Sequence, residues 1–139
     1  MPHLPHPMGA PRMLPTNGIH MAVWEAGQGF PVVFCHGFPE LAFSWRHQLP
    51  ALAAAGYRAI APDQRGYGLS DRPAAVTDYD VTHLTDDLAG LLDALGLERA
   101  VFCGHDWGGI VVWHMALLHP DRVAGVIALN TPFQARGSR

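Results

Sequence analysis

The sequence predicts a single α/β domain in which a mostly parallel β-sheet is covered by helices on both faces. Short apolar runs alternate along the chain with longer segments that repeat apolar residues at helical spacing. Strands that alternate with helices are typical of parallel sheets, whose crossover connections are nearly always right-handed. A chain of 139 residues, 49% of them hydrophobic, can bury the core of one such domain.

The predicted strands come in two groups. A hairpin opens the domain, because Asn17-Gly18 is a favoured two-residue turn between the segments Met13–Thr16 and Ile19–Ala26. Four later apolar runs are too short for a typical helix and are predicted as buried strands: Pro31–Cys35, Tyr57–Ala61, Ala100–Cys103 and Val123–Leu129. Residues 1–15 hold five prolines and are predicted as a mobile N-terminal arm outside the domain.

Three segments between the strands show helical patterns. The first, Trp45–Ala55, ends at Gly56, and the second has apolar residues on one face from Val81 to Leu95 before Gly96. The third, Gly108–His119, is apolar on almost every side and is stopped by Pro120. It is therefore predicted to be the most buried helix.

The composition disfavours several classes of partner. A net charge of −3 and a pI near 6.3 give no reason to expect nucleic acid or an anionic membrane surface. No apolar run approaches the roughly 20 residues that a membrane-spanning helix requires. The two cysteines, Cys35 and Cys103, lie in apolar segments and are predicted to be buried free thiols, which indicates the reducing cytoplasm.

The most informative loop follows the strand Ala100–Cys103 and has Asp106 at its centre. It reads Gly104-His105-Asp106-Trp107-Gly108-Gly109 and has the form of a nucleophile elbow, in which a sharp strand-to-helix turn exposes the central side chain. Serine usually occupies the centre and suits acyl transfer. A carboxylate that attacks saturated carbon leaves instead an ester that water can cleave. The alternative reading of Asp106 is an ordinary helix N-cap.

A second loop, His36-Gly37-Phe38-Pro39-Glu40, follows the strand Pro31–Cys35. In proteins with a nucleophile elbow, a backbone N–H from such a loop and the N–H just after the nucleophile form the oxyanion hole. The predicted donors are therefore Phe38 and Trp107, while a simple tight turn made by Gly37 and Pro39 is the alternative.

Together these motifs resemble the soluble epoxide hydrolases, members of the α/β-hydrolase fold. The resemblance runs from Val33 to Phe133 and includes H-G-F-P-E, Pro62-Asp63-Gln64-Arg65-Gly66-Tyr67-Gly68, G-H-D-W-G-G and Leu129-Asn130-Thr131-Pro132-Phe133. It implies that Asp106 attacks an epoxide carbon, that Phe38 and Trp107 hold the oxyanion, and that His36, Gly37, Pro39 and His105 line the site. It also implies a cis Phe38-Pro39 bond and a structural role for Arg65.

The resemblance further implies that residues 16–139 form the N-terminal part of an α/β-hydrolase domain, with about six of its eight strands and without its cap domain. The cap tyrosines, the second acid and the base histidine of the family lie beyond Arg139. This chain alone is therefore expected to take up an epoxide at most once, without turnover. It is also expected to self-associate through the exposed edge of Val123–Leu129.

Three other functions are compatible with parts of this pattern. Haloalkane dehalogenases share the aspartate and tryptophan but typically carry asparagine at the position of Phe38, and haloacetate dehalogenases tend to carry arginine at that of Trp107. A short non-catalytic protein that keeps the fold for binding is a third reading. No cofactor is expected, because the sequence holds no dinucleotide or phosphate-binding glycine motif, and no metal, because it lacks H-E-x-x-H and C-x-x-C.

Overall fold

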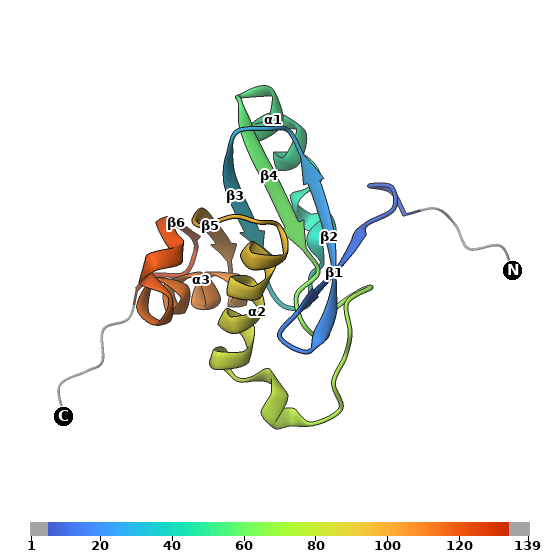
Figure 1. Ribbon diagram of the computed structural model, residues 1–139, viewed down its shortest axis with the longest axis vertical. Coiled ribbons are helices and arrows are strands. Elements are labelled where there is room, and N and C mark those ends of the chain that lie inside the picture. The colour runs from blue at the N-terminus through green and yellow to red at the C-terminus, as the bar shows by residue number, and fades with distance from the viewer. Residues whose placement is uncertain (1–5, 134–139) are drawn as a thin grey trace, which may run out of the picture.

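The computed structural model of the protein describes residues 6–133 and contains one six-stranded sheet (Figure 1). The strand order is β1-β2-β4-β3-β5-β6. The hairpin strands β1 and β2 are antiparallel, β2 pairs antiparallel with β4, and the other neighbours are parallel. The strands are β1 (Arg12–Thr16), β2 (Ile19–Ala26), β3 (Phe30–Cys35), β4 (Tyr57–Pro62), β5 (Ala100–His105) and β6 (Val123–Leu129).

Helices cover both faces of this sheet, which confirms the predicted architecture. The helices are α1 (Gln48–Ala54), α2 (Val81–Ala94) and α3 (Trp107–Leu118), with single 3₁₀ turns at Ala42–Trp45, Val76–Tyr79 and Pro120–Arg122. Helices α2 and α3 bury one cluster against the sheet, which includes Ile60, Phe102 and Met115. Helix α1 and the turn before it bury the opposite cluster, which includes Phe34 and Trp45. Among the described residues, no helix is both long and apolar enough to cross a bilayer.

The sheet begins inside the segment that was predicted to be a mobile arm. Strand β1 starts at Arg12 and includes Pro15, which an edge strand tolerates because one row of its backbone groups faces away from the sheet. Before it, the His6 ring stacks on the Trp24 ring at 4.5 Å, and the Trp24 indole N–H donates to the carbonyl of Gly9 at 3.0 Å. The division at residue 15 is therefore wrong from residue 6 onward, because Trp24 offers this segment a packing surface. Residues 1–5 lie outside the described part.

Helix α3 is less buried than its composition predicted. Its N-terminal Trp107 and its C-terminal Leu117 and Leu118 are 58%, 59% and 49% exposed. The inner face, with Val111, Val112 and Met115, packs against the sheet, but a helix at the side of the described sheet has only one face to bury. The apolar residues on its other side therefore remain accessible.

The two cysteines are buried and free, as predicted. Cys103 pairs in register with Phe34, so Cys35 is one residue out of step with it. Successive side chains of a strand point to opposite faces, and accordingly Cys35 lies in the cluster under α2 and α3 while Cys103 lies in the cluster under α1. The two thiols therefore lie on opposite faces of the sheet, which prevents a disulfide. Burial raises the pKa of the Cys103 thiol to about 11.

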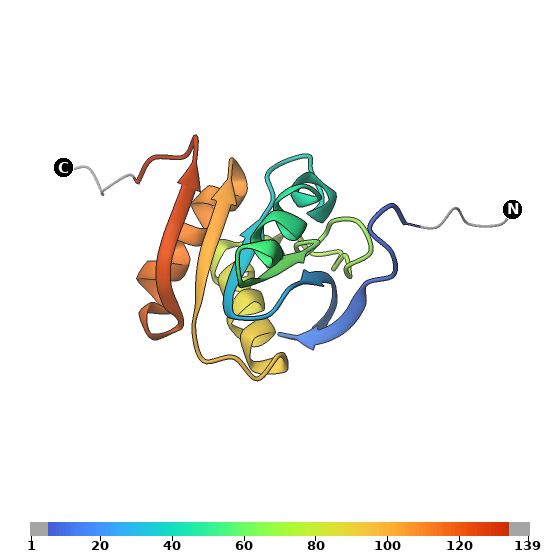
Figure 2. The same cartoon turned by 90° about the horizontal axis from the view of Figure 1, so that it is seen from above.

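Strand β6 forms an outer edge of the sheet in the described part of the chain (Figure 2). It pairs only with β5, and its Ile127 and Leu129 are 48% and 43% exposed.

We expect the 139-residue chain to self-associate through β6. The Ile127→Lys variant should shift toward monomer, because a charge on an edge strand opposes strand addition. Light scattering after size exclusion measures this, with Leu118→Lys on α3 as the control. A chain that is monomeric at every concentration contradicts the expectation.

Candidate active site

Asp106 lies at the sharp turn from β5 into α3, as predicted for the centre of an elbow. Its backbone has φ 58° and ψ −123°, a conformation that L residues rarely adopt. Two glycines make the turn possible by leaving room for the backbone. A Cβ on Gly104 would collide with the carbonyl oxygen of Gly108, and one on Gly108 would collide with the carbonyl oxygen of Cys35.

The Asp106 carboxylate accepts a hydrogen bond from the backbone of the loop after β3. The Phe38 N–H donates to Asp106 Oδ2 at 3.1 Å, across 68 residues of chain. The hydrogen bonds from the backbone N–H groups of Trp107 and Phe38 lower the pKa of Asp106, with a smaller contribution from the nearby His105. The carboxylate is therefore an exposed anion at neutral pH, and one of its oxygens already lies against the predicted oxyanion donors.

The loop of Phe38 approaches this closely because its neighbour is a glycine. A Cβ on Gly37 would lie 2.6 Å from the Cβ of Asp106. The Phe38-Pro39 peptide bond is cis, as expected. Any larger residue at position 37 would separate the Phe38 N–H from the carboxylate.

The buried His36 side chain anchors the same loop through hydrogen bonds. Its Nδ1–H donates to the Gly37 carbonyl at 3.0 Å, and its Nε2 accepts the Gln64 backbone N–H at 3.0 Å. The Gln64 side chain returns a hydrogen bond to the His36 carbonyl at 2.7 Å. An imidazole that both donates and accepts is neutral, and burial lowers the pKa of His36.

This arrangement predicts a loss of stability in mild acid. The pKa of His36 is lower in the folded chain than in the unfolded chain, so the stability it supports is present above about pH 6.5 and is lost as pH falls through the folded pKa. We expect the free energy of unfolding to decrease below pH 6.5 and His36→Gln to flatten that slope. Urea titrations between pH 5 and 7.5 measure it, with the exposed His47→Gln as control. Equal slopes in all three proteins would contradict this role.

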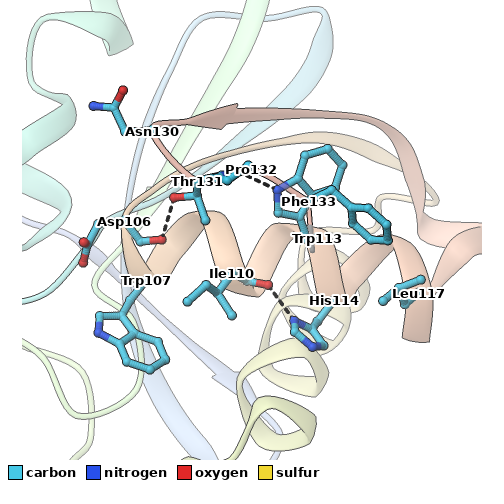
Figure 3. A pocket seen from close by; sticks show the side chains of 10 residues that line it. All are labelled: Asp106, Trp107, Ile110, Trp113, His114, Leu117, Asn130, Thr131, Pro132 and Phe133. Atoms are coloured by element: carbon cyan, nitrogen blue, oxygen red, sulfur yellow. Dashed lines mark hydrogen bonds between the residues drawn. The ribbon is translucent and has the colours of Figure 1, made fainter. Parts of the chain in front are cut away.

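Two cavities flank the Trp107 side chain. The first, of about 350 Å³, lies between α3 and the segment after β6, and Asp106 is on its wall (Figure 3). The second, of about 360 Å³, lies on the other side of Trp107, with Phe38, Tyr67 and Tyr79 among its aromatic walls. Apolar surface beside a fixed anion suits a substrate with apolar groups next to the reacting carbon.

The predicted site residues divide into two sets. Asp106, Phe38, Trp107 and Gly37 are in direct contact, and His36 lines the second cavity. His105 and Pro39 are not among the residues that line the two cavities, although each is the chain neighbour of a residue in this first set. The His105 ring lies 3.3 Å from the carboxylate of Glu40, which follows the Phe38-Pro39 segment. In the described residues, no group of three His, Cys, Asp or Glu side chains could hold a metal ion.

Part of the first cavity was not assigned to the site from sequence. Its wall includes residues of α3 and of the segment after β6: Ile110, Trp113, His114, Leu117, Asn130, Thr131, Pro132 and Phe133. The carboxyl ends of parallel strands meet at one edge of the sheet, so the residues after β6 could have been predicted to border Asp106. The sequence pattern of α3 predicts a buried helix and does not indicate which of its residues line this cavity.

Arg65 has the structural role predicted for it. Its side chain is buried and makes two hydrogen bonds of 2.8 Å to the two carboxylate oxygens of Asp87 on α2. Its remaining donors reach the carbonyls of Asp78 and Asn17. The guanidinium therefore ties the loop after β4 to α2 and to the β1–β2 turn.

Residues 31–137 match the family model of the alpha/beta hydrolase fold. This range begins in β3 and includes both loops that meet at Asp106. The chain belongs to the α/β-hydrolase fold family. In this α/β hydrolase the matched range includes most of β3, all of β4 to β6 and the elbow after β5, whereas the hairpin strands β1 and β2 precede it.

The chain is also similar to individual α/β hydrolases. It is 63% identical over 129 residues to epoxide hydrolase A of Mycobacterium tuberculosis, covering 90% of this chain and 40% of that protein. It is 52% identical to bifunctional epoxide hydrolase 2 of Sus scrofa, covering 84% of this chain and 21% of that protein. The crystal structure of epoxide hydrolase A from Mycobacterium thermoresistibile superposes with a TM-score of 0.89 at 56% identity, over 92% of this chain and 41% of that one. The chain thus spans about 40% of the length of the two mycobacterial relatives.

Proposed function

We propose that this α/β hydrolase opens epoxides to diols through an ester on Asp106. The observation that supports the proposal most strongly is the hydrogen bond from the Phe38 N–H to Asp106 Oδ2 at the strained elbow. An ordinary N-cap aspartate accepts from the start of its own helix, whereas this carboxylate makes no side-chain cap hydrogen bond and is bound by a loop from another strand. Its relatives named epoxide hydrolases support the same reading.

In the first step, the Asp106 oxygen that Phe38 does not hold attacks an epoxide carbon. The ring C–O bond breaks, its electron pair goes to the epoxide oxygen, and that oxygen takes up a proton. Because Asp106 is already anionic, attack requires no general base. The product is an ester between Asp106 and the substrate.

In the second step, water attacks Cγ of the ester, and Oδ2 carries the developing negative charge. The N–H groups of Phe38 and Trp107 are the donors that would stabilise this charge. Collapse of the intermediate breaks the bond between Cγ and Oδ1, and Oδ1 leaves with the substrate carbon and takes up one proton of the attacking water, whose other proton goes to solvent. The diol therefore carries Oδ1 and the former epoxide oxygen as its two hydroxyls. The carboxylate is restored with one oxygen from water.

The resemblance to epoxide hydrolases assigns the proton donors and the water-activating histidine to parts of those proteins that this chain does not span. General-base assistance typically contributes about 10²–10⁴-fold to such a step. For the 139-residue chain we therefore propose slow formation of a long-lived ester, without multiple turnovers.

The test is incubation of the chain with a reactive aryl epoxide, followed by intact-mass measurement, peptide mapping and diol analysis. The expected result is one epoxide mass per chain, on the peptide that contains Asp106, and no catalytic accumulation of diol. A parallel incubation with an alkyl halide tests dehalogenase chemistry, since the same aspartate would release halide. No adduct from the epoxide and a rapid adduct from the halide would overturn the proposal in favour of the dehalogenase.

A further inference from the structure

The segment after β6 contacts the backbone of the nucleophile elbow directly. The Thr131 hydroxyl donates to the carbonyl oxygen of Asp106 at 3.0 Å (Figure 3). The same hydroxyl also lies 3.3 Å from the Leu129 carbonyl. This contact joins two loops that are 25 residues apart, and neither the proposed reaction nor the family match assigns it a role.

We propose that Thr131 is a positioning residue that orients the Trp107 N–H in the oxyanion hole. The carbonyl of Asp106 and the N–H of Trp107 belong to one planar peptide unit, so a partner that fixes the carbonyl also fixes the direction of the N–H. The proposal deepens the proposed function, since it assumes that Asp106 is the nucleophile.

The residues around the hydrogen bond between Thr131 and Asp106 are tightly packed. A Cβ on Gly109 would lie 2.5 Å from the Cβ of Thr131, so only glycine lets α3 approach the segment at this point. Asn130 has a positive φ of 58°, which turns the chain after β6. Thr131 is thereby brought against the first turn of α3.

A second contact one turn along α3 fastens the same segment. The Trp113 indole N–H donates to the Thr131 carbonyl at 2.8 Å, and the Trp113 ring packs edge-on against Phe133 with centroids 5.4 Å apart. Thr131 is therefore held at its carbonyl while its hydroxyl holds the elbow. Both contacts are visible in the wall of the first cavity (Figure 3).

The elbow needs an outside partner because its conformation is strained. The Asp106 carbonyl also accepts from the N–H of Gly109 at 2.9 Å and of Ile110 at 3.3 Å, but both donors belong to the helix that the elbow begins. A strained φ/ψ persists only when its surroundings over-determine it. Thr131 supplies a side-chain restraint on that carbonyl from outside α3.

The test compares Thr131→Val, which keeps the shape and removes the hydroxyl, with Thr131→Ser, which keeps the hydroxyl. In Thr131→Val we expect the midpoint of the Asp106 carboxyl titration, followed by NMR, to move up toward its ordinary value. The Trp107 amide should exchange its hydrogen several-fold faster, and the slow hydrolysis of the ester on Asp106, in which this N–H stabilises the developing charge, should slow further by roughly fivefold, the worth of one hydrogen bond. Thr131→Ser should restore all three.

Thr85→Val is the matched control, because Thr85 is a buried threonine on α2 whose hydroxyl donates to the Val81 carbonyl. It should leave the Asp106 titration and the Trp107 exchange unchanged. If Thr131→Val does not fold, Trp113→Phe removes the donor to Thr131 and should move both readouts in the same direction. An unchanged Asp106 titration and Trp107 exchange in the folded variant would overturn the proposal. Because neither readout needs a substrate, this failure is distinct from a failure of epoxide chemistry.

Discussion

Replacement of Asp106 by asparagine is expected to slow covalent modification by an aryl epoxide by about 10³-fold or more. In the proposed reaction the carboxylate is the attacking group, and a neutral amide has no charged oxygen to donate to carbon. Backbone N–H groups lower the pKa of Asp106, so the wild-type rate should stay constant from neutral pH down to the acidic range where the carboxyl becomes protonated. Intact-mass kinetics at several pH values measure both effects.

Asp80→Asn provides the matched control for this experiment. Asp80 is also an exposed aspartate at the start of a helix, it accepts the His83 backbone N–H at 2.9 Å, and hydrogen bonds from His83 lower its pKa. It has ordinary extended backbone dihedrals and is not at a strained elbow. Modification that persists in Asp106→Asn and is lost in Asp80→Asn would show that helix-terminal carboxylates react generally and that the elbow is not the site.

Replacement of Arg65 by methionine is expected to lower the free energy of unfolding by about 3–5 kcal/mol, because removing one partner leaves a buried charge unpaired. Arg65 and Asp87 have side chains only 4% and 1% exposed, and the pair is bidentate. Urea denaturation of the 139-residue chain measures the change. The double variant Arg65→Met/Asp87→Leu should recover part of the loss, since it removes both charges.

Arg12→Met is the control for Arg65→Met. Arg12 also pairs with a carboxylate, that of Glu25, at 2.9 Å, but its side chain is 60% exposed. Exposed ion pairs typically contribute about 0.2–1 kcal/mol, so the control should change stability little. Equal effects at the two positions would show that burial of the Arg65 pair does not determine its contribution.

The strand and helix pattern was predictable because each element carries its own local signal. Short apolar runs marked β3 to β6, and Asn17-Gly18 marked the first turn. The elbow was predictable for the same reason, since Gly104 and Gly108 lie only two residues on either side of Asp106, whose turn they permit. Arg65 was correctly expected to be structural, but its partner Asp87 was not identified, because no local pattern relates the two.

Features that depend on strand register or on contacts between distant residues could not be predicted from the sequence. The faces of Cys35 and Cys103 follow from the pairing of Phe34 with Cys103, and a shift of one residue reverses them. The burial of α3 depends on how many strands and helices pack around it, and the apolar composition of the helix does not contain that information. The contact between Thr131 and Asp106 requires the paths of two loops that separate strands place together.

The span between Phe38 and Asp106 has a consequence for how the protein acquires its site during synthesis. The two residues come from β3 and β5, which are neighbours in the sheet, yet α1, β4 and α2 lie between them in the chain. No local segment can form this pair, so the closure of a long crossover must precede it, and such non-local pairings form slowly. A growing chain therefore carries the loop of Phe38 for a further 68 residues before Asp106 exists to meet it, and the pair first forms when β5 docks beside β3.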